Sequence, residues 1–143
     1  MIEHILHKEQ VLAIIIRDRF RDPGITFVTP GSYSQQLAYM NHPEGKTIAP
    51  HRHNPVSRKI ELTNEVLFIK KGTLRVDFYA DDDTYLRSLN LSAGDTILLV
   101  SGGHGFKVLE PIEMIEVKQG PYAGEGDKTR FEPISDEDVR YGE

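Results

Sequence analysis

Short runs of apolar and β-branched residues recur along the chain, separated by residues that favour turns. Within several runs apolar and polar positions alternate, which is the pattern of half-buried strands. The segments between them, such as TPG at 29–31, KKG at 70–72 and SGG at 101–103, are good turn formers. The pattern therefore predicts about ten short strands, over residues 25–28, 35–40, 46–49, 58–62, 65–70, 73–79, 84–91, 95–100, 105–110 and 112–118.

Many short strands at regular spacing are typical of a β-sandwich or a small β-barrel. The segment 9–18 fits a helix or a strand by its periodicity, and its Val and Ile residues favour a strand. A chain of 143 residues is long enough for one all-β domain with a sizeable core. We expect N-terminal strands or an arm over 1–35, a barrel over 36–118 and a polar tail over 119–143.

Composition and charge exclude several classes of protein. A formal charge of −5 argues against a nucleic-acid-binding protein, which would present a basic surface. No apolar run is long enough to span a bilayer, and the N-terminal MIEHILHKEQ lacks the basic start and apolar segment of a signal peptide. The absence of cysteine excludes disulfides, thiolate metal ligands and cysteine nucleophiles. We therefore expect a cytoplasmic protein that contacts neither nucleic acid nor membrane.

Two histidines one residue apart, His51 and His53, lie in the stretch GKTIAPHRHNPVSR. Side chains at positions i and i+2 of a strand share a face, so both imidazoles can converge on one point. The remaining histidines outside the barrel motifs, His4, His7 and His42, have no matched spacing and are interpreted as surface residues.

A carboxylate and a third imidazole have the parity to join them. Glu65 shares its strand face with Leu67 and Ile69, so an inward carboxylate that needs a polar partner is expected there. His104 shares its face with Phe106 and can also point inward. Three imidazoles and one carboxylate would suit Fe(II), Mn(II), Ni(II), Co(II) or Zn(II), and the spacing does not choose among them.

The first group of these residues resembles the first motif of the cupins, which are small jelly-roll β-barrel proteins. That motif has a Gly, five residues and then His-x-His, and later a Glu six residues before a Gly. Gly45 precedes His51 and His53 at this spacing, and Glu65 precedes Gly72.

The second cupin motif begins with Gly and ends in His. Gly94 and Asp95 open it here, Gly102 stands at its internal Gly position, and His104 closes it. The resemblance covers residues 36–118. It implies a single-domain cupin jelly-roll barrel and a divalent metal ion held by His51, His53, Glu65 and His104.

The carboxylate position is open to two interpretations. Eleven residues separate His53 from Glu65, where cupins usually have three or four. Counting from the histidines places the position at residues 57–58, and counting back from Gly72 places it at Glu65. Inward parity selects Glu65, and Glu61 is the alternative.

The resemblance favours a metal-dependent enzyme, of the isomerase, epimerase or dioxygenase type, acting on a small polar metabolite. The substrate would be sugar-derived or an oxo or hydroxy acid, because small cupins include enzymes of carbohydrate metabolism. The alternatives are a non-catalytic small-molecule-binding cupin and a structural cupin without metal. Arg58 has the parity to reach the barrel mouth and bind an anionic substrate, and a surface salt bridge is the alternative.

Exposed barrel edges and the apolar segment 11–16 favour a homodimer, because an exposed strand invites pairing. The alternative is that residues 11–16 pack across their own barrel. The segment 127–130 is interpreted as a solvated loop. We expect the interior to contain Tyr39, Leu67, Phe68, Ile69, Val76, Phe78, Leu99, Phe106 and Val108.

Overall fold

The computed structural model describes residues 1–142. Within this range no helix is long and apolar enough to cross a membrane. The helices found there are two single 3-10 turns, η1 (Glu125–Asp127) and η2 (Asp136–Asp138). The strands are β1 (Ile2–His7), β2 (Gln10–Ile16), β3 (Gly24–Phe27), β4 (Ala38–Asn41), β5 (Glu65–Tyr79), β6 (Tyr85–Ser92), β7 (Thr96–Leu99) and β8 (Gly103–Lys118).

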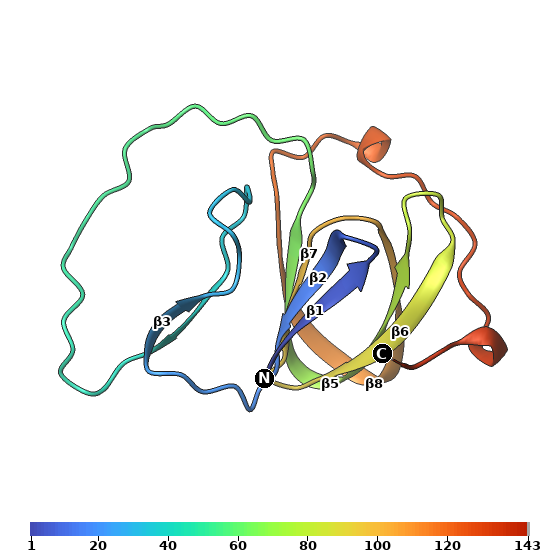
Figure 1. Ribbon diagram of the computed structural model, residues 1–143, viewed down its shortest axis with the longest axis horizontal. Coiled ribbons are helices and arrows are strands. Elements are labelled where there is room, and N and C mark those ends of the chain that lie inside the picture. The colour runs from blue at the N-terminus through green and yellow to red at the C-terminus, as the bar shows by residue number, and fades with distance from the viewer. Residues whose placement is uncertain (143) are drawn as a thin grey trace.

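Six of the strands form one antiparallel sheet that curls into a half-barrel (Figure 1). The sheet has the order β1-β2-β7-β5-β6, and β8 pairs with the other side of β5 along most of its length. Strands β3 and β4 form a separate two-stranded ribbon. The all-β class is therefore confirmed, and a closed jelly roll stays a prediction.

The half-barrel owes its curvature to a bend shared by β5 and β8. The predicted turn at 70–72 and the predicted break between the strands 105–110 and 112–118 are wrong, because each lies inside a continuous strand where the pairing register shifts. Gly72 has a φ of +86°, and a Cβ there would lie 2.1 Å from the carbonyl oxygen of Pro111. Only glycine fits a position that has both a left-handed backbone and so close a neighbour.

The core lies on the concave face of the sheet. Five residues predicted to be interior are buried there, but Val108 is 51% exposed and that prediction is wrong. Val108 faces inward in register with buried Leu74, so its exposure means that little covers this side of β8. The five confirmed core residues are Leu67, Ile69, Val76, Phe78 and Leu99.

Three aromatic residues were also expected inside. Phe68 and Phe106 are exposed, which contradicts the expectation, and Tyr39 is half-buried in an edge-to-face contact with Phe20. Phe68 lies on the convex face of β5 and Phe106 on the concave face of β8. Most residues of β8 are likewise exposed, whereas Lys107 near its start pairs with Asp136 of the C-terminal segment.

Residues 11–16 are an internal part of the sheet. Strand β2 lies between β1 and β7, and residues 12–16 are all buried. The premise that a second copy must cover this segment is wrong, because the chain's own neighbouring strands cover it. The homodimer itself stays a prediction.

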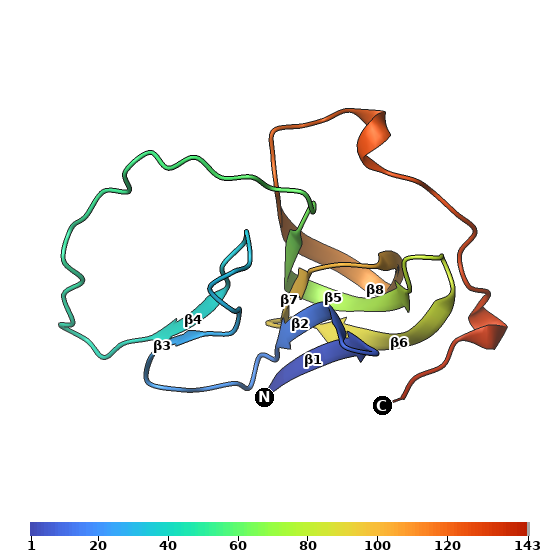
Figure 2. The same cartoon turned by 45° about the horizontal axis from the view of Figure 1, so that its top comes forward.

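The region between β2 and β5 stands away from the half-barrel in both views (Figures 1 and 2). It contains the β3–β4 ribbon and residues 42–64, which form no strand. The predicted strands 46–49 and 58–62 are therefore absent. Residues 42–62, here called the arm, trace a wide arc before the chain enters β5 (Figure 2).

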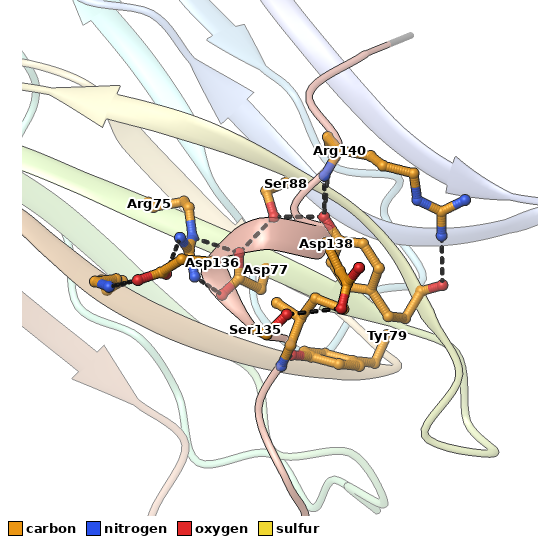
Figure 3. A network of polar contacts seen from close by, with 11 residues as sticks. Arg75, Asp77, Tyr79, Ser88, Ser135, Asp136, Asp138 and Arg140 are labelled. Atoms are coloured by element: carbon orange, nitrogen blue, oxygen red, sulfur yellow. Dashed lines mark hydrogen bonds and ion pairs between the residues drawn. The ribbon is translucent and has the colours of Figure 1, made fainter.

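A polar network ties the C-terminal segment to the convex face of the sheet (Figure 3). The buried guanidinium of Arg75 donates from Nε and Nη2 to the two carboxylate oxygens of Asp77, over 2.8 and 3.0 Å. Its Nη1 donates over 2.8 Å to Asp136, which begins η2. Ser88 on β6 also donates to Asp77. Every oxygen and nitrogen of this buried ion pair is thus directed at a partner, as burial of charge requires.

Candidate functional site

Glu65 and His104 come together at one end of the half-barrel. Glu65 begins β5 and lies on the concave face, as its parity with Leu67 and Ile69 predicted, and it is buried. His104 stands near the start of β8. Its imidazole Nε2 lies 3.3 Å from the Glu65 carboxylate Oε2, so the buried carboxylate has the polar partner it needs.

The electrostatic surroundings favour the ionised form of Glu65. The hydrogen bond with His104 lowers the pKa of the Glu65 carboxyl, and this effect outweighs the burial that raises it. The positive charges of Lys118 and Lys128 lower the pKa further. Glu65 is therefore a carboxylate anion at neutral pH and can act as an acceptor or a metal ligand.

The pair lines a cavity of about 630 Å³, which is large enough for a small metabolite. The wall combines the Glu65–His104 pair with the cations Lys128 and Arg130 and the rings of Phe106 and Phe131. Residues 127–130, interpreted from the sequence as a solvated loop, thus form part of the wall although their side chains are exposed. The other lining residues are Thr63, Tyr79, Gly102, Gly103, Gly105, Glu116, Asp127, Thr129 and Pro133.

His51 and His53 lie elsewhere, exposed on the arm. Their rings contact each other edge to face with centroids 5.3 Å apart, and His51 Nδ1 lies 3.0 Å from the Ala49 carbonyl oxygen. Neither lines the cavity that Glu65 and His104 share. Over residues 1–142, no cluster of three or more His, Asp or Glu side chains is placed to hold a metal ion. The four predicted ligands are thus present as two separate pairs.

The two further candidates also lie on the arm. The Glu61 carboxylate is exposed and pairs with Lys59 over 2.8 Å, and it does not line the cavity of Glu65 and His104. Arg58 is exposed and lines a separate hollow of about 350 Å³ beside Lys118. It does not border the cavity of Glu65 and His104.

One motif residue has a structural contact that the sequence did not indicate. Asp95 is buried and accepts hydrogen bonds over 2.9 Å from Arg17 Nη1 and from the backbone amides of Asp18 and Ser92. It therefore joins the end of β2 to the β6–β7 turn. The acidic residue of a Gly-Asp pair at a turn is the available signal, since Asp side chains commonly accept backbone hydrogen bonds there.

The cavity-lining role of Lys128, Arg130 and Phe131 was missed for a different reason. This segment is held beside the cavity by the Phe131 ring, which packs edge to face on Tyr79 at a centroid distance of 5.0 Å. These two residues are far apart in the sequence. No periodic pattern marks such a contact, so sequence reasoning could not find it.

Scans of this chain against models of known protein families, curated proteins and solved structures give no match. The resemblance to the cupins therefore rests on the motif spacing within residues 36–118, and function has to be argued from the site itself.

Proposed function

We propose that this chain is a cupin-type protein that binds a divalent transition metal and acts on a small polar metabolite. The observation that carries the proposal is the pairing of buried Glu65 with His104 in the wall of a metabolite-sized cavity. A buried carboxylate and an imidazole directed at one point are the donor types that Fe(II), Mn(II), Co(II), Ni(II) and Zn(II) accept.

The two side chains fit part of a metal site. Glu65 supplies an anionic oxygen and His104 a ring nitrogen, and motif spacing adds His51 and His53 as the other two ligands. The arm must bring those imidazoles to the cavity for the set to be complete. A metal bound there would act as a Lewis acid or would activate a bound oxygen species.

The rest of the wall supports a small anionic or hydroxylated substrate. Lys128 and Arg130 offer positive charge beside the carboxylates of Glu116 and Asp127, and Thr63 and Thr129 offer hydroxyl groups. The ring of Phe106 can cover an apolar part of the substrate and reduce its contact with water. An oxo acid, a hydroxy acid or a sugar derivative combines these features. We therefore propose an enzyme of the isomerase, epimerase or dioxygenase type.

The test is the metal content of protein purified without an affinity tag, together with its melting temperature with and without a chelator. We expect bound transition metal, a lower melting temperature after chelation, and recovery when metal is added back, because an ion that binds the folded state stabilises it. Glu65→Gln and His104→Gln should lose the metal. Glu61→Gln, which changes an exposed carboxylate in the same way, should keep it.

A second measurement addresses the substrate. Replacing Lys128 and Arg130 by Ala should weaken the binding of small carboxylic acids in titration calorimetry and leave the metal content unchanged. Full metal content in Glu65→Gln, or none in wild-type protein supplied with Co(II), would contradict the proposed function.

A further inference from the structure

Strand β8 is more exposed to solvent than its many apolar residues would lead one to expect. It pairs with β5 along one edge, and no backbone hydrogen bond from residues 1–142 satisfies its other edge between 103 and 118. Free strand edges of this length invite pairing with another strand. Apolar side chains are also exposed on both of its faces, namely Phe106, Val108, Leu109, Met114, Ile115 and Val117.

The arm has the complementary properties. It is extended without being paired, although a structureless segment of this length is uncommon in a compact domain. Residues 45–60 contain none of the 22 acidic residues of the chain, and they contain Lys46, Arg52, Arg58 and Lys59. The arm also exposes the apolar side chains of Ile48, Val56, Ile60 and Leu62.

β8 carries the charges that the arm would need to meet. Between Lys107 and Lys118, residues 108–117 of β8 contain Glu110, Glu113 and Glu116 and no basic residue. A basic, apolar, unpaired segment and an acidic, apolar, unpaired strand edge match in charge, in hydrophobicity and in backbone hydrogen bonding. Pairing between them would satisfy both.

The attachment of the arm is compatible with its reaching a second half-barrel. Next to the arm, the side chain of buried Asn64 donates over 2.8 Å to the Val100 carbonyl oxygen and accepts over 3.1 Å from Ser34 Oγ. These bonds hold the base of the arm while residues 42–62 extend outward (Figure 1). A second copy can receive the arm in this direction with the bonds intact. Exchange of identical segments is also a low-cost route to a dimer.

We propose that two copies of this chain exchange arms, so that the arm of each lies along β8 of the other and closes its half-barrel. His51 and His53 of one copy would then meet Glu65 and His104 of the second copy. The metal site would be incomplete in a single chain. This inference rests on the proposed function for the role of the histidines, and the arm exchange itself can be tested without metal.

The first experiment uses the absence of cysteine, which lets a single engineered pair report the contact. A His53→Cys, His104→Cys double variant is oxidised at micromolar concentration and run on a non-reducing gel. Arm exchange predicts a covalent dimer, whereas closure of the arm on its own half-barrel predicts a cross-linked monomer. The control is His53→Cys with His4→Cys, because exposed His4 lies on β1, at an edge of the sheet remote from β8. Circular dichroism verifies that each variant keeps its strands.

The second experiment uses complementation. One variant carries His51→Ala and His53→Ala, and the other carries Glu65→Gln and His104→Ala. Each alone should bind no Co(II). The two are co-expressed with different tags that do not bind metal, and the hetero-oligomer is isolated. Arm exchange predicts one Co(II) per heterodimer, which is half the wild-type content, because one of its two sites combines the intact halves.

The results separate the two proposals. Light scattering should give twice the 16.2 kDa chain mass for the wild type. A wild-type monomer, an intramolecular cross-link, or a dimer that forms no His53–His104 cross-link would overturn the arm exchange. A covalent dimer whose wild type binds no Co(II) would keep the arm exchange and overturn the metal site.

Discussion

Two regions of the sheet, the internal strands β2 and β7 and the outer strand β8, differ in how completely neighbouring segments cover them. Strands β2 and β7 each have a neighbour on both edges, and their central residues are buried on both faces. Strand β8 carries apolar residues along its whole length, interrupted by charged ones, yet it has one neighbour and most of its residues are exposed. An alternating or continuous apolar pattern therefore specifies which face a strand must bury, but not which segment covers it. Substitutions in covered and exposed strands should differ accordingly.

The largest effect should come from two phenylalanines on the same concave face. Phe78 is 1% exposed and Phe106 on β8 is 41% exposed. We expect Phe78→Ala to lower the free energy of unfolding by about 3–5 kcal/mol, the usual cost of a cavity in a closed core. Phe106→Ala should change it by less than about 1 kcal/mol in dilute solution, because little is packed against that ring. Urea denaturation measures both.

Protein concentration sharpens the same comparison. If the arm of a second copy covers β8, Phe106→Ala should become more destabilising as the concentration rises, whereas the cost of Phe78→Ala should stay constant. Equal costs for the two variants at low concentration would contradict the contrast between covered and exposed strands.

The next largest effect on stability should distinguish two glycines whose φ values are similar. Gly72 and Gly45 have φ values of +86° and +81°, but a Cβ at Gly72 would meet Pro111 and a Cβ at Gly45 would meet nothing within 4 Å. Gly72→Ala should cost about 2–4 kcal/mol from backbone strain and steric overlap together. Gly45→Ala should cost about 1 kcal/mol, from the backbone alone. Thermal unfolding of the two variants gives the difference, and equal costs would show that the bend can relax.

The contact between the C-terminal segment and the convex face of β5 and β8 should also respond to acid, through Asp136. Lys107 first, and then Arg75, lower the pKa of the Asp136 carboxyl below the ordinary aspartate value of 3.8. A carboxyl whose pKa is lower in the folded state stabilises that state above 3.8, and the contribution disappears as the pH falls through the folded value. Asp136→Asn should therefore lower the melting temperature at neutral pH, and the difference from wild type should shrink below about pH 4.

Glu137→Gln, an exposed neighbour in the same turn, is the control for that measurement. It should show no such convergence with the wild type. A difference between Asp136→Asn and wild type that stays constant down to strong acid would mean that the ion pairs of Asp136 contribute nothing.

The smallest effect is expected on the arm. Lys59 and Glu61 form an ion pair in which both side chains are largely exposed. Such pairs are screened by water and salt, so Lys59→Ala should change the free energy of unfolding by no more than about 0.5 kcal/mol. A larger loss that grows with protein concentration would indicate that the arm is held in an interface, and light scattering on the same samples would identify it.

The sequence was a reliable guide where a strand's neighbours are close along the chain or its pattern is strong. The strands around Glu65, Phe78 and Leu99 were predicted with their inward faces, and the parity of Glu65 placed it in the interior. Strand β1 was not singled out, because polar Glu and His residues interrupt its apolar pattern. Local alternation thus sufficed for the centre of the sheet.

Other features depend on contacts that no local pattern encodes. The segments 46–49 and 58–62 have strand-like composition, but a strand needs a partner edge, and none lies beside them. The contact of Phe131 with Tyr79 brings Lys128 to the cavity from a segment with no strand or helix pattern. The motif spacing predicted four convergent ligands, whereas the position of the arm separates them into His51 with His53 and Glu65 with His104.

The bond between Arg75 and Asp136 also has a consequence for how the chain folds as it is synthesised. The two residues lie 61 positions apart, so Arg75 leaves the ribosome well before its second carboxylate exists. A nascent chain that has made β5 and β6 holds a guanidinium opposite Asp77 with one of its donors still in contact with water. The sheet can bury that charge fully only after residues 131–142 have emerged and crossed it (Figure 3). A chain that ends before residue 131 would therefore keep a hydrated charge on its convex surface, and we expect this part of the sheet to open more often in it than in the chain of 143 residues.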